Sequence, residues 1–165
     1  MKIQDALVEL PPGTGIIRSE YLSHGTLEVY SLSASRRFYE EFLGLQCVRH
    51  GRRSMAIRAG MKFHIVCLQV GERLKPVSVD NHWGIDVAER EDVDHAFKAA
   101  HEFKEKYGIV HITDPVDQHG AYSFYLEDRD HNWWEIQHYD GVQHEDMFDF
   151  GDRFDDSDLP ESVRE

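Results

Sequence analysis

The feature that most constrains the fold of this chain is an internal repeat. Residues 24–29 read His-Gly-Thr-Leu-Glu-Val and residues 82–87 read His-Trp-Gly-Ile-Asp-Val, so both fit His-x-x-aliphatic-acid-Val. Each copy is followed by a helical pattern that ends in glycine and an aliphatic residue, at Gly44 and at Gly108. Two copies are too few for a solenoid. The repeat therefore predicts a duplicated unit that folds into one compact body.

The first copy predicts a strand, a helix and three further strands. Residues 24–32 have the mixed apolar and polar character of a strand. Ser33 is a candidate N-cap, Phe38 and Phe42 then share one helical face, and Gly44 can end the helix. The three strands expected next, separated by glycine turns, cover residues 45–49, 54–58 and 62–70.

The second copy repeats this order. Residues 82–87 form a strand, and apolar residues spaced three and four apart predict a helix from Val93 to Tyr107. We expect an α+β fold of two paired βαβββ modules. Three more strands are expected in the second module, at 109–113, 121–127 and 133–139. The predicted organisation is an N-terminal arm (1–22), a domain over 23–140 with modules at 23–71 and 81–140, and an acidic C-terminal tail (141–165).

Charge and cysteine content exclude several classes of protein. Acidic residues number 31 against 18 basic ones, which gives a net charge of -13 and argues against binding nucleic acid or an anionic membrane. Cys47 and Cys67 are the two cysteines, and the chain has no long apolar run and no secretory h-region after Met1. We therefore expect a reduced, cytoplasmic protein with neither a disulfide scaffold nor a membrane span.

Two histidines and one glutamate form a candidate metal site. His24 and His82 hold equivalent places in the repeat, so a pseudo-twofold axis would let them face each other across a shared cavity. Glu135 lies between Trp134 and Ile136, where a carboxylate needs a cation or a hydrogen bond to offset its desolvation. Two imidazoles and one carboxylate make a facial triad that leaves positions open for substrate or O2.

These units, with the closing run Ser123-Phe-Tyr-Leu-Glu-Asp-Arg-Asp-His-Asn-Trp-Trp-Glu135, resemble the vicinal oxygen chelate superfamily. It includes glyoxalase I, type I extradiol dioxygenases, fosfomycin-resistance thiol transferases, methylmalonyl-CoA epimerase and bleomycin-binding proteins. The resemblance covers about residues 22–140, with Arg129 and His131 in place of a usual Pro and Gly. It implies that the modules form an open eight-stranded half-barrel around a metal that is chelated by vicinal oxygens of the substrate.

Within this superfamily the ligand set resembles that of the single-domain extradiol dioxygenases most. Glyoxalase I supplies a further Glu from the last strand of the first module, but here residues 62–70 contain no Glu and His64 is the strongest possible ligand. Extradiol enzymes place an acid/base His before the second ligand, which His64 matches, and a Tyr ten residues before the Glu, which Tyr125 matches. His119 is a candidate for a further catalytic histidine.

Each proposed catalytic residue also has a simpler structural interpretation. Tyr125 could equally pack in the core or line the substrate pocket. His64 could be a hydrogen-bonded histidine of the core, and His119 could be an ordinary loop residue. Trp133 shares the strand face of Glu135 and is expected to line the substrate pocket. His138 should point to the opposite face.

The leading hypothesis is an Fe(II)-dependent dioxygenase that cleaves a catechol-like aromatic with O2, an activity of aromatic compound catabolism. One alternative is a glyoxalase-like isomerase, epimerase or thiol transferase that uses Mn, Ni, Zn or Co as a Lewis acid. Another is a drug-binding protein of the bleomycin-resistance kind, a class that usually lacks the metal ligands. The expected partners are a small aromatic substrate, O2 and a second copy of the chain in a homodimer.

Overall fold

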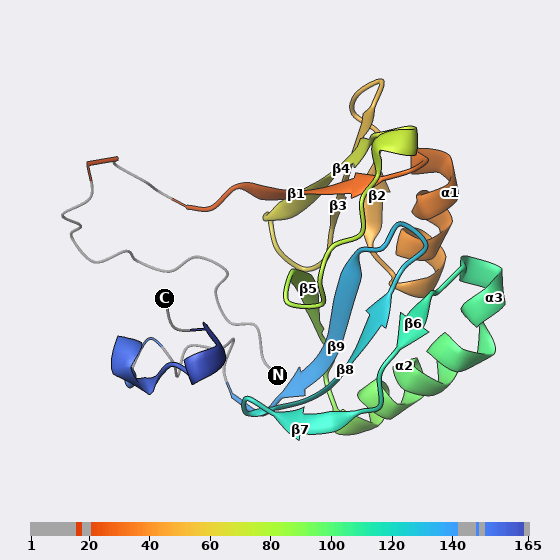
Figure 1. The fold of residues 1–165 in the computed structure, drawn as a ribbon. Coiled ribbons are helices and arrows are strands. Elements are labelled where there is room, and N and C mark those ends of the chain that lie inside the picture. The colour runs from red at the N-terminus through yellow and green to blue at the C-terminus, as the bar shows by residue number, and fades with distance from the viewer. Residues whose placement is uncertain (1–15, 18–20, 142–147, 149–150, 164–165) are drawn as a thin grey trace.

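The computed structural model describes residues 16–17, 21–141, 148 and 151–163, and most of the predicted N-terminal arm and part of the acidic tail lie outside them. Between residues 21 and 141 the repeat becomes two modules, each with its own sheet (Figure 1). The fold class is confirmed as α+β with two sheets.

The first module builds a four-stranded sheet in the order β1-β4-β3-β2. Its first and last strands pair in parallel, and the other neighbours are antiparallel. The elements are β1 (His24–Val29), α1 (Leu32–Arg37), the π-helix η1 (Phe38–Phe42), β2 (Gln46–Val48), β3 (Ser54–Arg58) and β4 (His64–Gln69).

The second module repeats this plan with one extra strand, in the order β5-β9-β8-β6, and β7 also pairs with β8. Again the first and last strands of the module are parallel neighbours. After the short helix η2 (Gly71–Arg73), the elements are β5 (His82–Asp86), α2 (Arg90–Glu102), α3 (Lys104–Tyr107), β6 (His111–Ile112), β7 (Val116–Gln118), β8 (Ala121–Glu127) and β9 (Trp133–Tyr139). Two exposed helical turns follow, η3 (Asp156–Asp158) and η4 (Glu161–Val163).

Three local predictions need correction. The first helix begins at Leu32 with Ser31 as N-cap, not at Ser33, because burial of Leu32 in the core draws it into the helix. The strand expected at 109–113 is shortened to β6 at residues 111–112, and β7 at residues 116–118 was not predicted; Pro115 between them has no N–H for a ladder. The helix expected to run from Val93 to Tyr107 breaks at Phe103, which has non-helical backbone angles.

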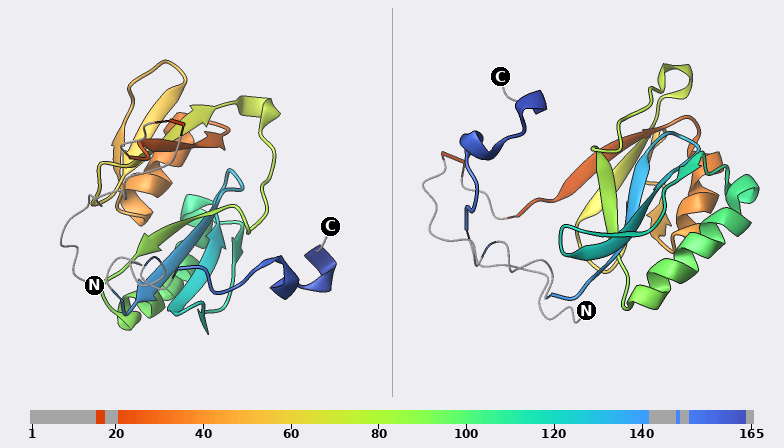
Figure 2. Two further views of the ribbon diagram at one scale, coloured as in Figure 1. Left: turned by 90° about the vertical axis from the view of Figure 1, so that its left-hand side faces the viewer. Right: turned by 60° about the horizontal axis from the view of Figure 1, so that its bottom comes forward.

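One hydrophobic core joins the modules. In β1 the buried residues Leu27 and Val29 alternate with the exposed His24, Thr26 and Glu28. The helices lie against the sheets (Figure 2), and the buried residues of both modules form a single cluster. The largest fully buried side chains of this core come from both modules: Trp134, Tyr39, Phe38, Phe124, Leu32, Met55 and Ile57.

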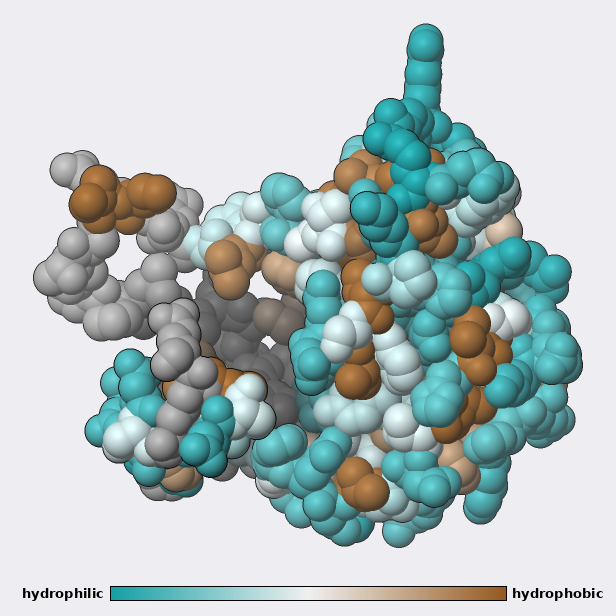
Figure 3. Space-filling model, in the orientation of Figure 1, coloured by the Kyte–Doolittle hydropathy of each residue, from teal (hydrophilic) through white to brown (hydrophobic). Residues whose placement is uncertain are grey.

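The two sheets stay separate and are not closed, as expected of an open half-barrel, and no group of three metal-binding side chains forms among the described residues. Hydrophilic residues cover most of the visible surface of the body (Figure 3). No helix in the described part of the chain is long and apolar enough to cross a membrane.

Candidate metal centre

The second sheet brings together two of the three predicted metal ligands. His82 begins β5, and Gly84, two residues later, pairs with Glu135 of β9 in parallel register. Side chains two apart on a strand share a face, so His82 and Glu135 lie on the same face of neighbouring strands. The Nε2 atom of His82 is 3.3 Å from Oε2 of Glu135.

The contacts of this pair leave its metal-binding atoms directed at each other. Nδ1 of His82 is 2.7 Å from the carbonyl oxygen of Val79. A carbonyl can only accept, so Nδ1 carries a proton and Nε2 is the ring nitrogen that a metal could bind. The Ser123 hydroxyl donates to Oε1 of Glu135 at 2.7 Å, and Glu135 is only 9 % exposed. A buried carboxylate beside an imidazole Nε2 is an arrangement that a cation would stabilise.

Tyr125 lies beside this pair. It is directly opposite Glu135 across the β8–β9 ladder, and its ring centroid is 5.0 Å from that of His82. The Gln118 amide donates to its hydroxyl at 3.3 Å. Burial, together with the hydrogen bond and the charge of Glu135, raises the pKa of Tyr125 to about 12. Tyr125 is therefore a protonated hydrogen-bond donor at neutral pH.

The first sheet carries a second pair of possible ligands. His24 of β1 and His64 of β4 are register partners on the outer face, and their rings stack with centroids 5.6 Å apart. Nδ1 of His24 is 2.8 Å from the hydroxyl of Ser23, which leaves its Nε2 for another partner. The sheet therefore groups His64 with the first predicted ligand.

The structure does not bring the two pairs together within one chain. Among the described residues no three His, Cys, Asp or Glu side chains form a group that could hold a metal. A Cβ added to Gly25 would lie only 2.2 Å from Cη2 of Trp83, so β1 and β5 approach through these residues. Successive residues of a strand point to opposite faces, and His24 and His82 therefore point away from this contact.

The structure places the two remaining predicted site residues, Trp133 and His119, differently relative to the His82–Glu135 pair. Trp133 lies on the face of Glu135, but its indole N–H donates to the carbonyl of Val77 at 3.2 Å. His119 is exposed in the β7–β8 turn with φ of 52°. That turn lies beyond Tyr139, four residues and thus about 13 Å along β9 from Glu135. Nothing in the described contacts links His119 to the pair.

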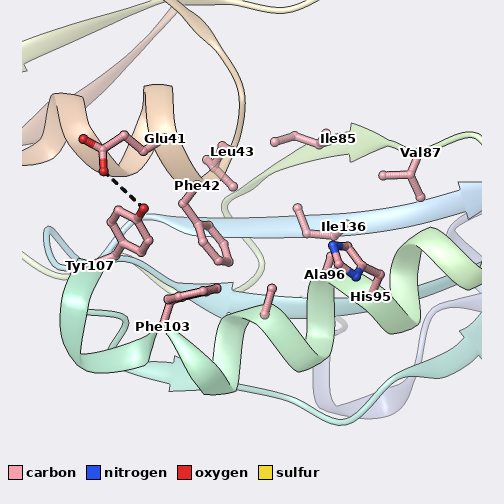
Figure 4. Close-up of a pocket in the computed structure, with 11 residues that line it drawn as sticks. Glu41, Phe42, Leu43, Ile85, Val87, His95, Ala96, Phe103, Tyr107 and Ile136 are labelled. Carbon is pink, nitrogen blue, oxygen red and sulfur yellow. Dashed lines mark hydrogen bonds between the residues drawn. The ribbon is translucent and has the colours of Figure 1, made fainter.

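A clear apolar cavity lies on the other side of the second sheet (Figure 4). Its volume is about 430 Å³, and Ile85, Val87 and Ile136 form its floor. These residues alternate with those on the face of Glu135, as does His138, whose ring contacts the carbonyl of Val87. The cavity is therefore separated from the candidate ligands by the sheet itself.

Sequence reasoning missed three groups that support the site: the Ser123 hydroxyl, the Gln118 amide and the Val79 carbonyl. Ser123 could have been found, because it lies on the same face of β8 as Tyr125 by simple alternation. Gln118 and the Val79 carbonyl reach the site through a hairpin and a loop. The path of such segments has no periodic signal in the sequence.

Comparison with known proteins identifies the family. Residues 21–136 match the model of the Glyoxalase/Bleomycin resistance protein/Dioxygenase superfamily. The chain belongs to this superfamily. No curated protein matches the chain as a close relative.

Several solved structures share the fold. A virulence protein from Salmonella typhimurium has 25 % identity and a TM-score of 0.56, over 74 % of this chain and 99 % of that one. A possible glyoxalase from Bacillus cereus has 25 % identity and a TM-score of 0.56, over 72 % and 98 %. A lactoylglutathione lyase from Agrobacterium tumefaciens, with 15 % identity and a TM-score of 0.55 over 74 % and 96 %, shows the fold alone.

The superfamily generally binds divalent metals, and the donors present here fit such an ion. Imidazole nitrogen and carboxylate oxygen suit Fe(II), Mn, Ni and Zn alike. The proton on Nδ1 of His82 is held by a backbone carbonyl, as is usual for metal-binding histidines. The donor chemistry thus supports a metal centre without selecting its metal.

Proposed function

We propose that this protein is a metal-dependent enzyme whose metal centre is completed by two copies of the chain. His82 and Glu135 of one copy, with His24 of the other, would hold the ion. One observation carries the proposal: each sheet presents part of the ligand set on an outward face, and one chain does not join the parts.

A symmetric pair of chains satisfies both incomplete sites at once. If the outer face of the first sheet in one copy meets the outer face of the second sheet in the other, a twofold axis generates two equal centres. Glu135 supports this arrangement, because a carboxylate with so little exposure gains most from a cation. The proposed functional unit is therefore a homodimer.

The reaction we propose is ring cleavage of a catechol-like aromatic by O2 with Fe(II) as the metal. Fe(II) held by His82, Glu135 and the second copy's His24 would supply the redox chemistry that activates O2 toward the aromatic substrate. The overall step breaks one C–C bond of the ring and puts both atoms of O2 into the product. It needs no other oxidant or reductant.

The side chains of the protein supply the proton chemistry and the orientation. Tyr125, protonated at neutral pH beside Glu135, can donate a hydrogen bond to a substrate oxygen. His64 can accept a proton from a substrate hydroxyl, because a neutral imidazole has one ring nitrogen that acts as an acceptor. Its place beside His24 brings it to the centre with that ligand.

The same placement of His64 favours a second candidate function. If His64 is a fourth ligand, the set becomes three His and one Glu, which suits a Lewis-acid isomerase, epimerase or thiol transferase. His64→Ala separates the two functions. If His64 is a fourth ligand, the variant should bind metal much more weakly. If His64 is an acid/base residue, kcat should fall with little change in metal content.

The test of the reaction is O2 uptake by protein loaded anaerobically with Fe(II), measured with substituted catechols and hydroquinones. Uptake with a yellow ring-opened product, abolished in His82→Ala, is the expected result. One metal per chain without any uptake would favour the Lewis-acid function. Drug binding without metal would favour a bleomycin-resistance type of protein.

The test of the two-copy centre is complementation between inactive variants. His24→Ala and Glu135→Ala each lack one metal ligand. In a mixed dimer, one centre takes Glu135 from the His24→Ala chain and His24 from the Glu135→Ala chain, so this centre has all of its ligands. Random mixing should restore about a quarter of the wild-type centres, since half of the dimers are mixed. If each centre lay within one chain, co-refolding would restore none.

A further inference from the structure

The loop between the two modules is attached to the candidate metal face at two points. The Val79 carbonyl accepts from Nδ1 of His82 at 2.7 Å, and the Val77 carbonyl accepts from Nε1 of Trp133 at 3.2 Å. His82 and Trp133 are register partners on neighbouring strands. One cross-strand pair of side chains therefore holds one short stretch of the loop.

A compact turn over residues 78–81 contains the second anchor and directly follows the first. The Ser78 hydroxyl donates to Oδ2 of Asp80 at 2.9 Å and accepts from the Asp80 backbone N–H at 3.2 Å. The N–H of Asn81 donates to the Ser78 carbonyl at 2.9 Å. These bonds restrain the backbone on both sides of Val79, and Val77 is joined to the turn through Ser78, so the two anchor carbonyls belong to one restrained segment.

We propose that Trp133 is a positioning residue for His82, acting through this turn. By holding the Val77 carbonyl, Trp133 holds the Val79 carbonyl in place, and that carbonyl keeps the proton of His82 on Nδ1. Nε2 then keeps its lone pair and its direction toward Glu135. The inference rests on the proposed metal centre for its purpose, but the geometry that carries it is present in the chain alone.

This role differs from the substrate lining expected of Trp133. Its indole N–H is already engaged by the loop, and its ring meets His111 edge-on at a centroid distance of 5.7 Å. A residue that only lined the pocket would change substrate affinity and leave metal affinity alone. A residue that positions a ligand changes metal affinity in the absence of substrate.

The experiment compares Trp133→Phe, which keeps an aromatic ring and removes the N–H, with His111→Ala, which removes the ring contact and keeps the N–H. Nitrogen NMR of the metal-free protein, at a pH where the imidazole is neutral, reports which nitrogen of His82 carries the proton. We expect wild type and His111→Ala to hold the Nδ1–H form. Trp133→Phe should show a mixture of both forms.

Metal titration of the same proteins gives the second readout. Loss of an outer hydrogen bond to a ligating histidine weakens metal binding about 10- to 100-fold, and we expect a loss of this size in Trp133→Phe alone. Ser78→Ala removes hydrogen bonds of the turn without changing the sheet. It should shift the His82 tautomer and the metal affinity in the same direction as Trp133→Phe, and it provides a second test if Trp133→Phe does not fold.

The outcomes separate this inference from the proposed function. Unchanged tautomer and metal affinity in both Trp133→Phe and Ser78→Ala would overturn the positioning role, even with an active enzyme. Absence of metal binding by wild type would overturn the proposed function. The tautomer shift in metal-free protein would then still support the role of Trp133.

Discussion

Two sets of buried carboxylates show how differently this chain treats the same chemical group. Asp128 and Asp130, in the turn between β8 and β9, are each only 1 % exposed, and Glu135 on the following strand is 9 % exposed. All three would be costly to bury without partners. What separates them is the kind of atom that each carboxylate faces.

The two aspartates face hydrogen-bond donors. Asp130 accepts from the backbone N–H of Tyr30 at 2.8 Å and from the Ser35 hydroxyl. Asp128 accepts from the Tyr39 hydroxyl at 3.2 Å and from Nε1 of Trp134 at 3.0 Å, and also from two backbone N–H groups of its own turn. Tyr30, Ser35 and Tyr39 belong to the first module, so this turn joins the modules through polar contacts.

Glu135 faces the hydroxyl donors of Ser123 and Tyr125 and, in addition, a ring nitrogen of His82. Ser123 donates to Oε1, while Oε2 lies 3.3 Å from Nε2 of His82. A carboxylate whose partners are donors of the fold holds structure, and one that also lies beside a metal-binding nitrogen can bind a cation. The predictions below test this distinction, from the largest expected effect to the smallest.

Removal of the Asp130 carboxylate should damage folding most. Asp130→Ala removes the acceptor of the Tyr30 N–H and one of the two partners of the Ser35 hydroxyl, which keeps the Ser31 carbonyl, and an unsatisfied donor costs roughly 1–3 kcal/mol. Because the carboxylate is also almost fully buried, its removal leaves a void, and we expect the free energy of unfolding to fall by about 2–3 kcal/mol in urea denaturation. Asp117→Ala, which breaks an exposed ion pair with Arg90, is the control and should cost less than about 1 kcal/mol. Equal losses of stability in Asp130→Ala and Asp117→Ala would contradict a structural role for Asp130.

Glu135→Gln should affect metal affinity strongly and folding stability little. The neutral amide keeps the shape of the side chain and can still accept from Ser123, so the metal-free protein should unfold within about 1 kcal/mol of wild type. Metal affinity, measured by calorimetric titration, should fall by more than about 100-fold, because loss of an outer contact alone reaches that value. A variant that binds metal like wild type would show that Glu135 is a structural carboxylate.

Asp128 should give stability an unusual dependence on pH. Burial is the main cause that raises the pKa of Asp128 from 3.8 to about 6. The folded protein holds this proton more tightly than the unfolded chain, so the contribution is complete below pH 3.8 and is lost as pH rises through about 6.

Between pH 4 and 6 this group should lower the free energy of unfolding by on the order of 1 kcal/mol per pH unit. Urea denaturation across this range should show that Asp128→Asn lacks this part of the slope. Asp117→Asn is the control, since Arg90 lowers the pKa of Asp117 and its contribution is lost at lower pH. Parallel curves for wild type and Asp128→Asn would contradict the prediction.

The contact between β1 and β5 predicts a smaller effect. In Gly25→Ala the new Cβ would lie 2.2 Å from Trp83 Cη2, so the indole or the strand must shift, at about 1–3 kcal/mol. In Gly84→Ala the nearest atom is 3.6 Å away, and stability should change by no more than about 0.5 kcal/mol. Similar stability of the two variants in thermal unfolding would mean that the β1–β5 contact does not set the placement of the ligand strands.

Much of the fold follows from local pattern. The repeat at His24 and His82, the glycine stops and the alternation of the strands predicted both modules, because period and turn chemistry are properties of neighbouring residues. The boundaries that failed, at Leu32, Phe103 and Pro115, are places where core burial or a missing N–H changes the local preference.

The candidate site divides in the same way. The sequence by itself determined which residue types lie on which strand face, including the shared faces of Glu135 with Trp133 and Tyr125, since alternation is a local rule. Only the tertiary structure decided that His64 joins His24, that His119 stays apart, and that the two pairs of ligands do not come together within one chain. Those relations depend on how two sheets pack around one core, and that packing is fixed by contacts such as Gly25 with Trp83, between residues far apart in the chain.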